Sequence, residues 1–221
     1  MSWPMPPLCP CPSSSTGTTS TGWDAGITWR SLRTVDPADL PLEVGYIRDK
    51  VLRVVNDSVE DGHIERLIIE ATEAAEEETQ RALMPQTWQM ILSGFPSGDI
   101  VLERPPLIEV VSFGYLDADG ASQTLAVSPL DFQVIPSGKY RKARLRPLSG
   151  ASWPGTISTE EAVTITYRAG FSNDQDPQLM HIARGIALMV SELYKTRTLS
   201  VVGTSVSQAT LHLERFWKKV Y

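Results

Sequence analysis

The chain has 221 residues, of which 42% are hydrophobic and 21% are charged, so it is long enough to bury one large core or two small ones. It has no apolar run close to the ~20 residues that a membrane helix needs, which argues against a membrane protein. The formal net charge of -6 argues against nonspecific attraction to DNA or to an anionic membrane surface.

Residues 1–33 are expected to form an extended arm, because they are rich in proline, serine and threonine and cannot bury enough surface to offset the entropy of ordering. The arm lacks a continuous apolar core, so we expect no signal peptide. It contains Trp3, Trp23 and Trp29, however, and tryptophan often anchors interfaces. Two alternatives stay open: the arm orders against another subunit, or it is disordered.

Residues 34–84 are expected to form the first helical part. The pattern predicts a short helix over "LPLEVGYIRDKVLRV" and a longer one over about 58–82, which Pro85 should end. In the longer helix the apolar residues recur at helical spacing, and glutamates crowd the remaining surface. The apolar stripe consists of Ile64, Leu67, Ile68, Ala71, Ala74 and Ala75, and the glutamates are Glu65, Glu70, Glu73, Glu76, Glu77 and Glu78.

Residues 85–170 are expected to form a β-rich insertion, because short runs of strand type are separated by turn signals such as "SGFPSG" and "LSGASWPG". The run "AVTITYRAG" alternates between an apolar and a polar face. The "DADG" at 117–120 resembles the opening of a calcium loop, but later ligands are missing, so a hairpin turn is favoured.

Residues 171–221 are expected to return to helix. Asp176 is a good N-cap, Pro177 fits the first turn, and a wide apolar stripe follows. The last segment, "QATLHLERFWKKVY", is also amphipathic. The fold class predicted from these patterns is α+β: a helical bundle with an inserted β-rich subdomain and an extended N-terminal arm. The helices before and after the insertion should pack together.

Catalytic and metal-binding motifs are weak in this sequence. His63, His181 and His212 lack the paired ligand at helical spacing that metal sites use, and there is no nucleophile elbow, P-loop or dinucleotide fingerprint. We therefore expect no enzyme, no metal and no cofactor. The residues of 139–146 concentrate positive charge, and three alternatives stay open for them: a solvated edge strand, contact with an acidic protein, or contact with DNA. The cations are Lys139, Arg141, Lys142, Arg144 and Arg146.

A series of segments resembles the head-tail connector, or adaptor, proteins of tailed bacteriophages, and more narrowly the phiE125 gp8-like group. These segments are "ERLIIEATEAAEEETQRALMPQTWQMIL", "FPSGDIVLERPPLIEVVSFGYLDADGASQTL", "ASWPG", "AVTITYRAGF" and "VVGT", in this order within residues 42–205. The resemblance implies a ring of twelve copies that docks beneath the portal protein, contacts a stopper or tail protein and lets double-stranded DNA pass without sequence-specific binding. It also implies a place in the virion neck, with assembly in the host cytoplasm and no membrane partner.

Two surfaces are candidates for this role. The glutamates Glu73, Glu76 and Glu77 are predicted to face the channel, where like charge would let DNA slide; the alternative is a solvated helix face. The C-terminal segment is predicted to dock on the portal, and the alternative is that it closes the chain's own bundle. Its docking residues are Phe216, Trp217, Lys218, Lys219 and Tyr221.

The competing functions are a stopper or tail-completion protein and, from another class, a small hydrolase or carbohydrate-binding module built on the β region. A monomer with a pocket of convergent polar groups would favour the second class.

Overall fold

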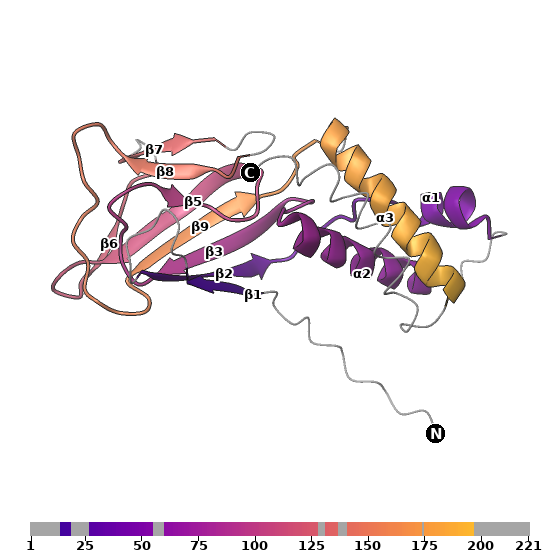
Figure 1. The fold of residues 1–221 in the computed structure, drawn as a ribbon, viewed down its shortest axis with the longest axis horizontal. Helices are drawn as coiled ribbons and strands as arrows, with labels where there is room; N and C mark the ends of the chain where they lie inside the picture. The colour runs from indigo at the N-terminus through magenta and orange to yellow at the C-terminus, as the bar shows by residue number, and fades with distance from the viewer. Residues whose placement is uncertain are drawn as a thin grey trace, which may run out of the picture.

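The computed structural model describes residues 14–18, 27–54, 60–127, 131–136, 141–173 and 175–196. Two antiparallel sheets lie at one end of the molecule and the helices lie at the other (Figure 1). The elements in chain order are β1 (Ser14–Thr18), β2 (Thr28–Val35), α1 (Val44–Tyr46), the π-helix η1 (Ile47–Leu52), α2 (Asp61–Thr79), β3 (Gln86–Leu92), β4 (Ile100–Val101), β5 (Leu107–Leu116), β6 (Ser122–Thr124), β7 (Phe132–Ile135), β8 (Arg144–Pro147), β9 (Val163–Ala169) and α3 (Pro177–Thr196).

The larger sheet has six strands in the order β1-β2-β3-β9-β5-β6, and the smaller sheet has three in the order β4-β8-β7. The alternation predicted for β9 is confirmed, because Val163, Ile165 and Tyr167 are buried while Arg168 is exposed. This buried face joins one apolar core with residues of the smaller sheet, such as Phe132. The two sheets therefore close around a shared core.

The N-terminal part of the chain differs from the arm expected over residues 1–33. Residues 28–35 form β2, which pairs along β3 from Trp29 opposite Leu92 to Val35 opposite Thr87. Strand β1 pairs with β2 in turn. The larger sheet therefore draws strands from before the first helices, and the β region is more than an insertion of residues 85–170. The inward positions of β2 include Ser31 and Arg33, so its sequence lacks the apolar–polar alternation that predicts a strand.

Helix α2 ends earlier than predicted. Its last residue is Thr79, and Gln80 adopts a left-handed conformation with a φ of 52°, its backbone N–H bonding to the carbonyl of Glu76. Pro85 lies beyond this cap, directly before β3, so it does not stop the helix. The predicted apolar stripe is buried except at Ala74, which is exposed.

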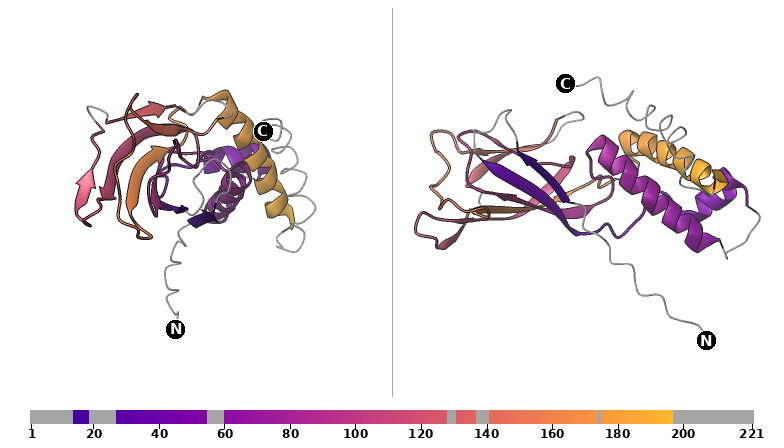
Figure 2. Two further views of the ribbon diagram at one scale, coloured as in Figure 1. Left: turned by 60° about the vertical axis from the view of Figure 1, so that its left-hand side comes forward. Right: turned by 60° about the horizontal axis from the view of Figure 1, so that its bottom comes forward.

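Helix α3 begins as predicted. The Asp176 side chain accepts a hydrogen bond of 2.8 Å from the Gln178 backbone N–H, and the Asp176 carbonyl accepts one of 3.0 Å from Met180. Helices α2 and α3 pack side by side over an apolar core that also contains Ile47 of η1 (Figure 2). The described helices are the long pair α2 and α3, with the short segment α1–η1 packed against it. The structure is therefore a mixed α/β chain and does not clearly show the predicted helical bundle.

The "DADG" stretch is a hairpin turn between β5 and β6, as predicted. The Asp117 side chain accepts hydrogen bonds of 3.0 Å from the Asp119 N–H and 2.9 Å from the Ala121 N–H. The Gln123 amide also donates to Asp117, and these bonds lower the pKa of that carboxyl. The carboxylate therefore fixes the turn itself.

Candidate functional site

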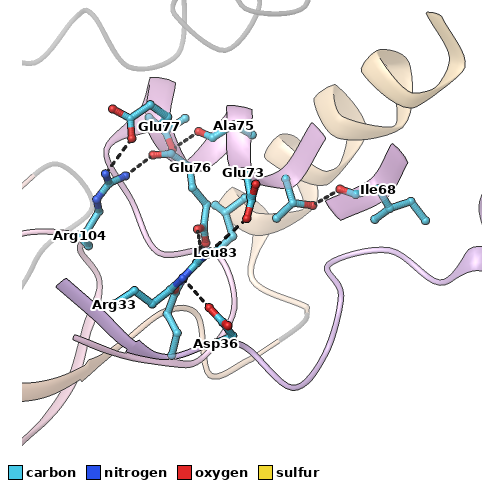
Figure 3. A network of polar contacts seen from close by, with 12 residues as sticks. Arg33, Asp36, Ile68, Glu73, Ala75, Glu76, Glu77, Leu83 and Arg104 are labelled. Carbon is cyan, nitrogen blue, oxygen red and sulfur yellow. Dashed lines mark hydrogen bonds and ion pairs between the residues drawn. The ribbon is translucent and has the colours of Figure 1, made fainter. Parts of the chain in front are cut away.

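In the described part of the chain, a dense set of buried polar contacts lies where the end of α2 meets the larger sheet (Figure 3). We call this set the polar joint. It draws on four segments, namely β2, α2, β3 and the loop between β4 and β5. Its members are Arg33, Glu73, Glu76, Glu77, Gln86 and Arg104.

Glu76 is the centre of the polar joint. Its residue is only 5% exposed, and its Oε1 atom accepts hydrogen bonds of 2.8 Å from the Leu83 backbone N–H and 2.7 Å from the Gln86 amide. Burial raises the pKa of Glu76, although these hydrogen bonds and the charges of Arg33 and Arg104 act in the opposite direction. The carboxylate ties the last turns of α2 to the start of β3.

Arg33 reaches this carboxylate from β2. Its side chain is 9% exposed, and its guanidinium lies 3.4 Å from Glu76, 3.3 Å from Glu73 and 2.8 Å from Asp36. A planar guanidinium with several donors can satisfy several carboxylates at once. Arg33 therefore neutralises one side of the buried charge and links β2 to α2.

Arg104 approaches from the other side. Its Nη1 donates a hydrogen bond of 2.8 Å to the Glu76 carbonyl, and its Nη2 lies 2.9 Å from a Glu77 carboxylate oxygen. The guanidinium also lies 5.2 Å from the centre of the Trp88 ring. A cation at the last carbonyls of a helix is favoured by the helix dipole. The two arginines therefore hold the C-terminal end of α2 against the sheets.

The acidic surface predicted on α2 is only partly present. The side chains of Glu73 and Glu77 are 60% and 70% exposed, so both can face solvent or a partner. The prediction was wrong for Glu76, which is buried inside the chain. The signal was available, since Glu76 continues the buried series Ile64, Ile68 and Thr72 in steps of four residues.

Of the predicted N-terminal and C-terminal contact residues, only Trp29 lies among the described residues. Trp29 lies in β2 and packs against the core of the sheets, so it belongs to the fold of its own chain. Trp3 and Trp23 lie outside the described residues. The predicted portal-docking residues Phe216, Trp217, Lys218, Lys219 and Tyr221 also lie outside them.

Within the basic cluster, Arg144 and Arg146 lie in β8, which is not an edge strand, and Lys139 lies outside the described residues. Strand β8 lies between β4 and β7, so the edge-strand alternative was wrong for its arginines. Arg146 makes two contacts of 2.7 and 2.8 Å with Asp99, and hydrogen bonding to Arg146 lowers the pKa of that carboxyl. Lys142 forms a single ion pair with Glu103. Much of this positive charge is therefore matched by carboxylates of the same chain.

A cleft of about 380 Å³ lies between the start of β5 and the start of α3. Arg81 and Asp176 are its titratable lining residues, and Asp176 is already engaged in capping α3. Among the described residues, no group of three His, Cys, Asp or Glu side chains could hold a metal ion. Within the same ranges, no helix is long and apolar enough to span a membrane.

The fold is shared with chains of gene transfer agent particles. The chain is similar to a chain in the virion of the native gene transfer agent particle, with a TM-score of 0.63, 22% identity, and coverage of 83% of this chain and 94% of that one. It is also similar to a chain in the neck of the empty particle computed with C6 symmetry, with a TM-score of 0.59, 23% identity, and coverage of 75% and 85%.

A third similar chain lies in the neck of the native particle computed with C12 symmetry, with a TM-score of 0.52, 20% identity, and coverage of 83% and 94%. No protein-family model matches the chain, and no curated protein matches it. At these identities the similarity shows a shared fold.

Proposed function

We propose that the chain is a structural neck protein of a phage-like particle, and more narrowly a head-to-tail connector (adaptor) of the phiE125 gp8-like kind. The observation that carries the proposal is the shared fold with a chain from a gene transfer agent virion, since the match covers 94% of that chain. Two further similar chains come from necks of such particles. The order of sequence segments that resembles the adaptors supports the same role.

In this proposal the chain forms a ring of twelve copies beneath a portal protein and extends the channel for DNA. The C12 symmetry of one similar neck supports this number. A repeated subunit around a channel must use heterologous contacts that close by rotation. The proposed role is structural and includes no catalysis.

The proposed surfaces are Glu73 and Glu77 toward the channel and the C-terminal residues Phe216, Trp217 and Tyr221 toward the portal. The exposure of the two glutamates supports the first assignment. Their ion pairs with Arg33 and Arg104 hold them against the sheets. Negative charge in the lumen would avoid tight contacts with DNA phosphates.

The test is negative-stain electron microscopy of the purified full chain mixed with the portal protein of its own particle. We expect a ring of density added beneath the portal. Density that appears only when another neck ring is already bound would identify a stopper or tail-completion protein. A chain that leaves both assemblies unchanged, and that is absent from the necks of purified particles, would contradict the proposal.

A further inference from the structure

Two exposed ridges on the helices have complementary chemistry. The α2 ridge consists of Glu65, Ile69 and Glu73, and the α3 ridge consists of Met180, Arg184 and Leu188. Members of each ridge are four residues apart, so they follow one another along a single face of the helix. Both helices are drawn in Figures 1 and 2 at the end of the molecule away from the sheets.

The apolar members are unusually open for their size. Met180 is 56% exposed, Leu188 is 51% exposed and Ile69 is 42% exposed. Met180 and Leu188 flank Arg184, which is itself exposed. Large apolar side chains grouped on a surface indicate an interaction site more often than single ones do.

The two ridges carry opposite charges, and the positions that are charged in one ridge are apolar in the other. The α2 ridge places a single apolar residue between two carboxylates, and the α3 ridge places a guanidinium between two apolar residues. Within the described part of the chain no ion pair involves Arg184, whereas Arg168 and Arg146 each pair with a carboxylate. Rows of side chains at four-residue spacing can interdigitate between two packed helices. Packed in this way, Arg184 could reach the carboxylates while Ile69 meets the apolar residues beside it.

The geometry points to a second copy of this chain as the partner: we propose that the α2 ridge of one subunit packs on the α3 ridge of the next. This inference rests on the proposed ring function. The contact joins two different ridges, so a pair that makes it once is heterologous and leaves one free ridge at each end. Where the rotation between neighbours closes, repetition of the contact builds a ring. Glu73 then lies at the joint between neighbouring subunits, and of the two exposed glutamates Glu77 is the one left to face the channel.

Mixed cross-linking of single-cysteine variants tests this contact. Cys9 and Cys11 are first replaced by serine, and one full-length chain then carries Ile69→Cys while a second, tagged chain carries Leu188→Cys. Both are incorporated into particles with their own portal, and the purified chains are also treated at high concentration with a short thiol cross-linker. We expect a cross-link between tagged and untagged chains. Neither variant alone should form it, and the control pair Val111→Cys with Leu188→Cys should not either.

A charge exchange gives an independent measurement. Arg184→Glu should weaken subunit association at least about tenfold, because the new carboxylate would face the carboxylates of the α2 ridge across the contact. Glu65→Arg in the same chain should restore most of the association, whereas Glu78→Arg, on the same helix but off the ridge, should not.

The outcomes separate the two proposals. If the chain occupies the neck but the mixed variants do not cross-link, the ridge contact is wrong and the neck function stands. Cross-linking of Leu188→Cys chains to one another would indicate a two-fold contact and would overturn the head-to-tail arrangement. A Leu188→Cys thiol that becomes reactive only after removal of residues 207–221 would show that the chain's own end covers the α3 ridge, and it would overturn the contact with a second copy. Absence of the chain from necks would overturn the neck function and, with it, the ring contact.

Discussion

Replacement of Glu76 by alanine should destabilise the chain by about 3 kcal/mol, because it removes the centre of the polar joint. The substitution leaves the Leu83 backbone N–H without its partner inside the core, which costs about 1–3 kcal/mol. Loss of one member of a buried ion pair costs about 3–5 kcal/mol. Arg33 keeps Asp36 and Glu73 as partners, so the lower end of that range applies.

The assay is urea unfolding of the full chain, with thermal unfolding as a second measurement. A loss of this size should lower the melting temperature by about 6–12 °C in a chain of this length. Glu78→Ala, an exposed position two residues further along α2, should change stability by less than about 0.5 kcal/mol. A loss below about 1 kcal/mol for Glu76→Ala would refute the view that this carboxylate holds α2 to the sheets.

The same carboxylate should make the stability of the chain depend on pH. Burial raises the pKa of Glu76 above its ordinary value of 4.5, so the folded chain binds this proton more tightly than the unfolded chain. The advantage of the natural chain over Glu76→Gln should therefore be largest below pH 4.5 and should decrease as the pH rises through the folded pKa. Free energies of unfolding measured for both chains from pH 4 upward check this, and an advantage that grows with pH would contradict it.

Three further substitutions test other parts of the fold by denaturant unfolding. Gly170→Ala should cost about 3 kcal/mol or more, because the φ of 130° disfavours a side chain and the new Cβ would lie 2.2 Å from the Met84 carbonyl oxygen. Asp99→Asn should destabilise at neutral pH, and the difference should vanish as the pH falls through the folded pKa of Asp99, which Arg146 holds below 3.8. Asp176→Ala should cost about 1 kcal/mol through the lost cap of α3.

Each of these has a matched control in the same chain. Gly155→Ala adds a Cβ in open space and should be nearly neutral. Asp119→Asn changes an exposed carboxylate in the β5–β6 turn without removing a contact like that of Asp99, and Gln175→Ala lies beside the cap without serving it. Equal losses in a variant and its control would refute the assigned contact.

The elements predicted correctly are those in which local pattern and burial agree. Helix α3 combines an N-cap, a proline in its first turn and a continuous apolar stripe, and β9 combines β-branched residues with strict alternation. Each signal lies within one segment. The pattern within each segment is therefore enough to predict its secondary structure.

The parts that were missed depend on contacts between distant segments. Arg33 of β2 points inward, although an arginine in a sequence is normally expected at the surface. It can be buried because Glu73 and Glu76 of α2 neutralise its charge. Glu76 was assigned to the surface for the converse reason, because its partners come from β2, β3 and the loop before β5. A buried ion pair is a property of two segments together, and neither one shows it alone. The proposed ring contact likewise involves a second molecule.

The path of the described chain between sheets and helices has a mechanical consequence. The backbone crosses from one end of the molecule to the other between β2 and α1, again between α2 and β3, and once more between β9 and α3. A load applied to the sheets is therefore shared by three covalent tethers, with the polar joint acting beside the middle one. Helices and sheets should tilt as one body under axial force rather than separate at a hinge, a property that the wall of the proposed DNA channel would need.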